Sequence, residues 1–197
     1  MRKPLAASLL FLALPAVAAT INVRVTDAKG APIPDAVVYA VPDGRVVPPA
    51  TKRSAVMDQR NRAFVPHVLP IQTGTAVSFP NSDDIRHHVY SFSAAKSFQL
   101  PLYKGTPASP IVFDRPGVVT LGCNIHDQMS AFIVIVDTPY FDKTGNGGAA
   151  AIKGVDAGRY LVRLWYPDMR DEPVPETVTV SGSDKITVSF GRGHGRS

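Results

Sequence analysis

The chain has 197 residues, of which 45% are hydrophobic and 19% charged, so it can build a core and is neither disordered nor fibrous. Its 18 prolines in 197 residues make up about 9%, close to twice the usual ~5%, which favours short strands and turns over long helices. The formal net charge of +5 comes without a clustered basic segment, so no nucleic-acid partner is expected. A single cysteine excludes a disulfide framework.

The first 19 residues have the three parts of a secretory signal peptide. Arg2 and Lys3 form a basic start, Leu5–Leu14 is an apolar run, and small residues lead to a cleavage position after Ala18 or Ala19. The apolar run is about half of the ~20 residues that a membrane-spanning helix needs. The sequence therefore predicts a periplasmic or secreted protein without stable membrane insertion.

Helical periodicity is nearly missing from the rest of the chain, whereas short alternating or wholly apolar runs recur between Gly, Pro, Asn and Asp residues. We expect strands at about Ile21–Thr26, Ala36–Val41, Phe64–Ile71, Thr75–Phe79, His88–Ser93, Gly117–Leu121, Ala131–Val136, Gly158–Tyr166, Glu176–Val180 and Lys185–Phe190. The pattern predicts an all-β protein built as Greek-key sandwiches.

Two distant segments resemble parts of one small sandwich. Ile21–Val41 contains D-x-x-G-x-P-I-x-x-A between two strands, which resembles the first hairpin of transthyretin-like or carboxypeptidase-regulatory-like domains. The expected continuation occurs only about a hundred residues later, as Lys143–Gly145 and G-x-Y-x-V-x-L-W at Gly158–Trp165. We therefore predict a discontinuous sandwich of residues 20–50 plus 138–191, an inserted domain of residues 51–137 and a flexible tail at 192–197. A divergent continuous sandwich is the alternative.

The single cysteine lies in a loop between two predicted strands. An unpaired cysteine in an exported protein is an intermolecular bridge, a reactive thiol or a metal ligand. Here Cys123, His126 and Met129 follow one another at steps of three. A thiol, an imidazole and a thioether at this spacing can surround one metal ion.

A soft copper site needs a second imidazole, because its plane is formed by two His and one Cys, with a weak axial Met. His87 lies six residues after Asn81 and opens a predicted strand. At this point the sequence resembles the cupredoxins, the blue type 1 copper proteins, and its Cys-x-x-His-x-x-Met loop has the short spacing of amicyanin. The resemblance covers about Phe64–Val136 and includes a lead-in from Pro66 that ends in G-x-x-V-x-F-x-N at Asn81.

The resemblance implies one copper ion that cycles between Cu(I) and Cu(II). His87, Cys123 and His126 would be its equatorial ligands, and Met129 would be the axial ligand. Asn81 would tie the two ligand-bearing loops together in the second shell and donate its backbone N–H toward the sulfur.

His88 competes with His87, but the family's ligand stands two residues before a valine, and Val89 gives that place to His87. His88 is then expected to be a satisfied imidazole that binds no metal. The remaining candidates match no motif and are expected to be structural or solvated: His67, Met57, Met169 and His194.

The loop departs from amicyanin at one place. Amicyanin-like loops carry Pro between Cys and His, whereas Asn124 and Ile125 both keep a backbone N–H. We expect an additional N–H···S bond, which would stabilise the thiolate of the reduced site and raise its potential.

Electron transfer is the function that the resemblance implies, with a cytochrome or a periplasmic dehydrogenase as partner. The expected exit is His126, beside Ile125 and Leu100–Leu102, with a basic rim of Lys96, Lys104 and Arg86. Accessory proteins of methylamine utilisation look similar, although no residue here indicates methylamine.

Copper delivery or sensing without a redox role is the alternative. An enzyme with Cys123 as nucleophile and His126 as base is not expected, because no third group or oxyanion site positions them. Structural zinc prefers four Cys or His ligands, and the fourth here would be Met129.

Overall fold

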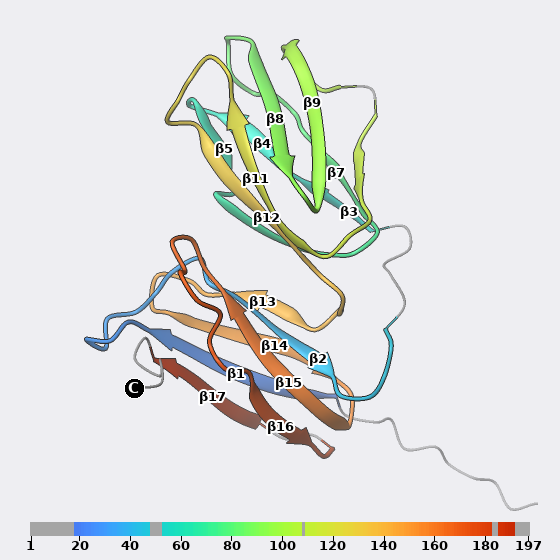
Figure 1. Cartoon of the computed structure of the whole chain (residues 1–197), viewed down its shortest axis with the longest axis vertical. Helices are drawn as coiled ribbons and strands as arrows, with labels where there is room; N and C mark the ends of the chain where they lie inside the picture. The colour runs from blue at the N-terminus through green and yellow to red at the C-terminus, as the bar shows by residue number, and fades with distance from the viewer. Residues whose placement is uncertain (1–17, 48–52, 108, 183–184, 192–197) are drawn as a thin grey trace, which may run out of the picture.

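A computed structural model describes residues 18–47, 53–107, 109–182 and 185–191 (Figure 1). The predicted tail lies outside the described residues, as does the predicted signal peptide except for its last two residues. Figure 1 shows the strands in two stacked groups, with residues 54–136 in the upper group and the segments on either side of them in the lower group.

The lower group is a sandwich of two sheets. One sheet has the order β14-β1-β17, and the other has the order β13-β2-β15-β16. The bounds are β1 (Ala19–Thr26), β2 (Val37–Pro42), β13 (Phe141–Lys143), β14 (Ala149–Val155), β15 (Gly158–Trp165), β16 (Glu176–Val180) and β17 (Lys185–Gly191). Strand β1 alternates buried Ile21, Val23 and Val25 with polar residues, and these valines and the isoleucine pack in one core with Tyr160.

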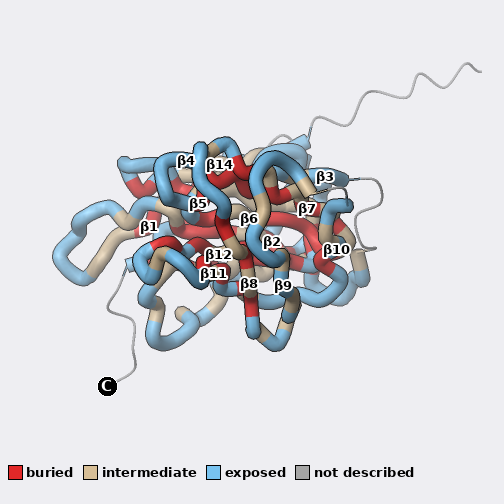
Figure 2. Tube along the Cα trace, turned by 90° about the horizontal axis from the view of Figure 1, so that it is seen from above, coloured by how far each residue is buried: buried red, intermediate tan, exposed pale blue. Residues whose placement is uncertain are grey.

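The upper group contains a five-stranded sheet, β6-β12-β11-β8-β9, a three-stranded sheet, β10-β7-β3, and the hairpin β4-β5. The bounds are β3 (Ser54–Val56), β4 (Asp58–Arg60), β5 (Ala63–Val65), β6 (Val68–Gln72), β7 (Thr75–Ser78), β8 (His87–Ser93), β9 (Lys96–Tyr103), β10 (Ile111–Phe113), β11 (Gly117–Cys123) and β12 (Ser130–Val136). A second core fills this group, with Phe79, Phe113 and Leu121 among its members. Seen from above, buried residues run through the middle of the molecule and exposed ones surround them (Figure 2).

A small apolar cluster joins the two groups. Val134 and Val136 of β12 pack with Val37 of the lower sandwich. The rings of Phe132 and Trp165 meet there with their centroids 5.3 Å apart. Apolar side chains on facing sheets thus seal the junction between the two sandwiches.

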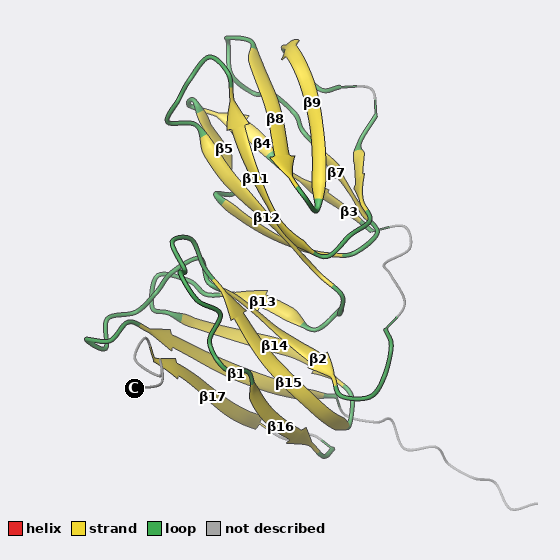
Figure 3. Ribbon diagram, viewed as in Figure 1, coloured by secondary structure: helices red, strands yellow, loops and turns green. Residues whose placement is uncertain are grey.

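The all-β prediction is confirmed: every helix or strand in the described part of the chain is a strand (Figure 3). Each predicted strand overlaps an observed one, but Phe64–Ile71 is divided into β5 and β6. The break falls at Pro66, which has no N–H to give to a ladder. Strands β3, β4, β9, β10, β13 and β14 were not predicted. The predicted domain bounds, and the transthyretin-like nature of the outer sandwich, stay predictions.

The turn between β13 and β14 shows why glycine is needed at one position. The N–H of Gly148 donates to Gly145 O at 2.9 Å, and Gly148 O accepts from Val25 N at 2.8 Å. Gly148 has φ +67°, and a Cβ there would lie 2.5 Å from Val25 O and 2.9 Å from Pro32 Cβ. Glycine therefore lets the turn lie directly against β1.

We predict that Gly148→Ala lowers the free energy of unfolding by at least about 2 kcal/mol, because it adds left-handed backbone strain to a clash with a carbonyl. Gly147→Ala is the matched control: a Cβ at Gly147 meets nothing within 4 Å, so its effect should stay within about 0.5 kcal/mol. Urea unfolding of both variants measures the difference. Equal stabilities would contradict this account of the turn.

Candidate metal centre

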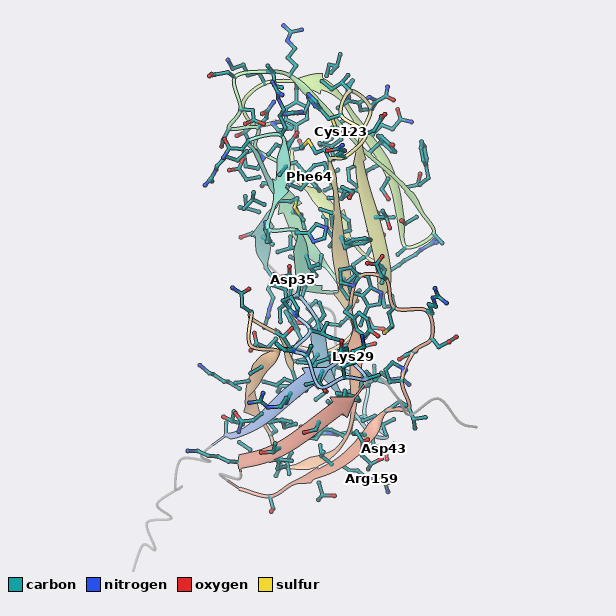
Figure 4. All side chains as sticks on the ribbon, turned by 90° about the vertical axis from the view of Figure 1, so that its left-hand side faces the viewer. Lys29, Asp35, Asp43, Phe64, Cys123 and Arg159 are labelled. Atoms are coloured by element: carbon teal, nitrogen blue, oxygen red, sulfur yellow. The ribbon has the colours of Figure 1, made fainter. Side chains whose placement is uncertain are left out.

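Three of the four predicted ligands, His87, Cys123 and His126, meet at the end of the upper sandwich that faces away from the lower one, where Figure 4 labels Cys123. Cys123 ends β11, and His87 begins β8. The two strands are antiparallel neighbours in which Cys123 pairs with Val89. The loop from β11 to β12 carries His126 back toward the same point.

The three donor atoms form a triangle. The Cys123 Sγ lies 3.7 Å from His87 Nδ1 and 3.9 Å from His126 Nδ1. With metal–sulfur and metal–nitrogen bonds of ~2.3 and ~2.0–2.1 Å, a 120° angle separates sulfur from nitrogen by about 3.7–3.8 Å, and a tetrahedral angle by about 3.5–3.6 Å. The observed separations of 3.7 and 3.9 Å are therefore close to those expected for ligands of one metal ion.

His87 is held from its far side. Its side chain is 0% exposed, and its Nε2 lies 2.8 Å from Asp83 Oδ2. The backbone N–H groups of Asn61 and Arg62, in the β4–β5 turn, donate to Asp83 Oδ1 at 2.5 Å and Oδ2 at 2.9 Å. Because a carboxylate only accepts, Nε2 carries the imidazole proton, and the Nδ1 lone pair points toward Cys123.

The charge of Asp83 is stabilised at this position. Burial alone would raise the pKa of Asp83, but the hydrogen bonds from the Arg62 N–H, His87 and the Asn61 N–H together lower it below its ordinary value. Asp83 therefore faces His87 as a carboxylate. Sequence reasoning missed this residue, and its position four residues before His87 was the one available signal.

Asn81 has a different role from the one that we expected. Its Nδ2 donates to Ile85 O and Tyr103 O, both at 2.9 Å, and its Oδ1 accepts from Asp83 N at 3.0 Å. Its backbone N–H donates to Gly105 O at 2.8 Å rather than to the ligand sulfur, because residues 81 and 105 form an antiparallel bridge. Asn81 thus braces the loop before His87 against the end of β9, and the expected link to the sulfur is wrong.

The expected N–H···S bond of the ligand loop is also absent from the described residues. The polar contacts of Cys123 Sγ are with the two imidazoles, and neither Asn124 nor Ile125 donates to it. The hydrogen bond that closes this loop runs instead from Met129 N to His126 O, at 2.9 Å. The loop therefore forms a turn whose backbone hydrogen bond does not involve the sulfur.

Met129 is buried beside the centre. Its side chain is 2% exposed and belongs to the same apolar cluster as Cys123. This position suits either core packing or a weak thioether ligand, and the ligand role stays a prediction.

Three of the residues expected to be structural pack against apolar residues, whereas His88 differs from its expectation. Met57 is in the upper core, Met169 packs against the lower core, and the His67 ring meets Phe132 edge-on at 5.6 Å. His88 is outside the ligand triangle, but the expectation that its imidazole is satisfied is wrong. Its Nε2 is buried without a hydrogen-bond partner in the described part of the chain, and its ring lies edge-on to that of Tyr90.

Tyr103 forms a buried network that sequence reasoning also missed. It pairs with His87 across β8 and β9, its hydroxyl donates to Phe79 O at 2.7 Å, and Gln59 Nε2 donates to that hydroxyl. Burial raises the pKa of Tyr103 to about 12, the Gln59 hydrogen bond acts against this rise, and charges on Asp58 and Cys123 add to it. The phenol is therefore neutral and serves as a fixed support for the strand opposite His87.

The surface around the centre is apolar with a few charges. Ile125, Leu102 and Ile85 are exposed, and Ile125 is next to His126, whose ring is partly exposed. Arg86 and Lys104 are exposed as well, although Lys104 lies 3.6 Å from an Asp84 oxygen.

Lys96 does not belong to this rim. Strand β9 begins at Lys96 and reaches the His87 end only at Tyr103, about 23 Å further along at ~3.3 Å per residue. The ammonium of Lys96 pairs with Asp114 at 3.0 Å. Leu100 also departs from the expected patch, because it is partly buried against the upper core.

No family model and no curated protein sequence matches the chain. Several solved structures do. The copper-containing nitrite reductase of Thermus scotoductus SA-01 is 23% identical, with a TM-score of 0.41, over 50% of this chain and 26% of the reductase. A purple cupredoxin from Nitrosopumilus maritimus is 21% identical, with a TM-score of 0.37, over 43% of this chain and 100% of that protein. Amicyanin from Paracoccus versutus is 15% identical, with a TM-score of 0.37, over 44% of this chain and 85% of amicyanin.

The chain thus spans about a quarter of the nitrite reductase and most or all of the two small proteins. These are similarities to cupredoxins over half of the chain or less. The function is argued from the residues of the site.

We predict that Asp83→Asn weakens Cu(I) binding by about 10- to 100-fold, because His87 loses the carboxylate that orients its ring. Competition against a chelator measures the affinity, and nitrogen NMR of the metal-free protein reports which ring nitrogen of His87 carries the proton.

Asp84→Asn is the matched control for this prediction. It removes the same charge one residue away, from a side chain whose recorded contact is with Lys104. Equal losses in the two variants would show that net charge, and not the contact with His87, sets the affinity.

Proposed function

We propose that the chain is an exported mononuclear copper protein that carries single electrons between redox partners through a type 1 site of two His, one Cys and one Met. The observation that carries this proposal is the triangle formed by Cys123 Sγ with the Nδ1 atoms of His87 and His126, at 3.7 Å and 3.9 Å from the sulfur. In the described part of the chain it is the one group of three or more His, Cys, Asp or Glu side chains close enough to share a metal ion.

The donor set suits copper better than other metals. Two neutral imidazoles and a thiolate serve both Cu(I) and Cu(II), whereas structural zinc takes four ligands in a tetrahedron. Bound there, copper would supply one-electron chemistry by cycling between Cu(I) and Cu(II). Met129 is our candidate for the weak axial ligand, because it is buried in the same cluster as Cys123.

The protein's part is to keep the ligands in place. Asp83 and the β4–β5 turn fix His87, and hydrogen-bonded strands hold Cys123 between β8 and β12. Such ligands move little when the charge of the metal changes, and a small rearrangement makes electron transfer fast. These features support a carrier rather than an enzyme.

The proposal of export is based on the first 19 residues. The start of β1 helps to choose between the two cleavage positions. Ala19 is the first residue of β1 and is buried. Cleavage after Ala18 leaves β1 whole, whereas cleavage after Ala19 removes its first residue, so we propose the first position and a periplasmic or secreted protein. The described residues contain no helix able to span a membrane.

The partner would dock where His126 approaches the surface. Exposed Ile125 and Leu102 offer an apolar contact, and Arg86 adds a positive charge at the edge. We propose an acidic redox protein, such as a cytochrome or a periplasmic dehydrogenase.

We predict that the mature protein turns intensely blue or green with Cu(II), from charge transfer between the Cys123 sulfur and copper. Cys123→Ser should abolish the colour, and His87→Ala should abolish or strongly alter it. His88→Ala is the control and should keep the colour, because His88 lies outside the triangle. Visible and EPR spectra decide, and a colourless Cu(II) complex with intact Cys123 would contradict the proposal.

We predict that Met129→Gln lowers the reduction potential, because an amide oxygen is a harder ligand than a thioether and favours Cu(II). Met57→Leu, at a buried core methionine, is the control and should leave the potential unchanged. Electrode titration measures both. A protein that binds Cu(I) without any reversible couple would instead favour copper delivery or sensing.

A further inference from the structure

A second approach to the centre lies on the outer face of the five-stranded sheet. Val89 and Ser91 of β8 point into the core, so Tyr90 and Phe92 point outward. Their rings lie 5.2 Å apart, and Phe92 is 73% exposed. The lower sandwich packs against β12 on this face at Phe132 and leaves this part of it uncovered.

Tyr90 reaches the backbone beside the ligand sulfur. It pairs with Gly122, the residue before Cys123, across β8 and β11. A Cβ on Gly122 would lie 2.7 Å from Tyr90 Cζ and 2.8 Å from its hydroxyl, so the ring fits only over a glycine. The phenol therefore rests on the peptide that leads directly into Cys123.

A recess of about 480 Å³ opens at this point. One part of its lining is aromatic, from Tyr90 and Phe92, and another is polar, from Thr120, Asn124 and Ser130. Cys123 and Met129 also contribute to it. The volume lies in the range of small-molecule sites.

We propose that this recess binds a small planar dihydroxybenzene, of the hydroquinone class, and is a second place where the copper site exchanges electrons. The inference rests on the proposed function. It adds a ligand class and an entry point separate from His126.

The lining selects this chemistry. Two aromatic rings favour a flat ring that stacks on them or meets them edge-on. The hydroxyl and amide groups of the lining can pair with ring hydroxyls, and Asp127 can accept a hydrogen bond from one. No Lys or Arg is among the described residues that line the recess, so an anion gains nothing there.

The reaction balances with copper as the oxidant. Copper held by His87, Cys123 and His126 would supply the one-electron oxidant, Cu(II). Each encounter would take one electron from the ring and release one proton from a ring hydroxyl to bulk water through the open side of the recess. Two encounters would convert one hydroquinone into one quinone and reduce two Cu(II) ions to Cu(I). Tyr90 stays chemically unchanged, because its ring provides only contact between the ligand and the backbone of Gly122, the residue before Cys123.

The first test needs no copper. Resorcinol is an isomer of hydroquinone that cannot form a simple quinone, and it is titrated into the metal-free full-length protein while amide NMR signals are followed. We expect saturable shifts at Tyr90, Phe92, Thr120 and Gly122. Shifts confined to Ile125 and His126, or no saturable shift, would overturn the proposal.

The second test compares two reductants of the Cu(II) protein by stopped-flow. Phe92→Ser should slow reduction by hydroquinone about three- to tenfold, in keeping with the strength of aromatic contacts, and leave reduction by hexacyanoferrate(II) unchanged. Val112→Ser removes an exposed apolar side chain on β10 and should change neither rate. Equal hydroquinone rates in the Phe92 and Val112 variants would overturn the proposal.

The two tests separate this inference from the proposed function. If the Cu(II) protein has no colour or cannot be reduced, the proposed function fails, and the resorcinol titration still shows whether the recess binds the ring. If the protein is a reversible copper carrier but Phe92→Ser acts like Val112→Ser, the recess proposal alone fails.

Discussion

The structure around the centre depends on one constraint: a thiol and two imidazoles must meet at one point although they come from two distant parts of the chain. The pairing of β8 with β11 satisfies this constraint. It places Cys123 opposite Val89 of β8, and His87 is the first residue of β8. The short loop to β12 needs only three residues to return His126 to the sulfur. The upper sandwich thus holds three donor atoms within 4.8 Å of one another.

The strands that could be predicted from the sequence differ from the missed ones in length and in the clarity of their alternation. Alternation is clear where one face is buried, as in β1 and β15. Four of the missed strands, β3, β4, β10 and β13, have three residues each, too few to show a period. Strand β9 contains Pro101 at a sheet edge, and β14 begins with three alanines, which have low strand propensity. Pairing with distant strands makes these segments strands, although their local sequence signals are weak.

The residues of the candidate site also differ in whether a local sequence signal identifies them. Motif spacing was enough to select Cys123, His126 and His87, because the ligands of one metal lie at fixed steps on short loops. It did not reveal Asp83, whose effect depends on the two N–H groups of a turn about 20 residues earlier. The expectations for Asn81 and for the loop amides were wrong for a related reason. Their hydrogen bonds depend on which backbone lies nearest, and a motif does not record that.

The position of the lower sandwich explains why the centre has two open sides. Its contact uses Phe132, Val134 and Val136, which lie on the outer face of the five-stranded sheet. Tyr90 belongs to the same face but lies beside Gly122, at the metal end. Covering one part of this face and leaving the other bare keeps both the His126 edge and the Tyr90 recess open to solvent.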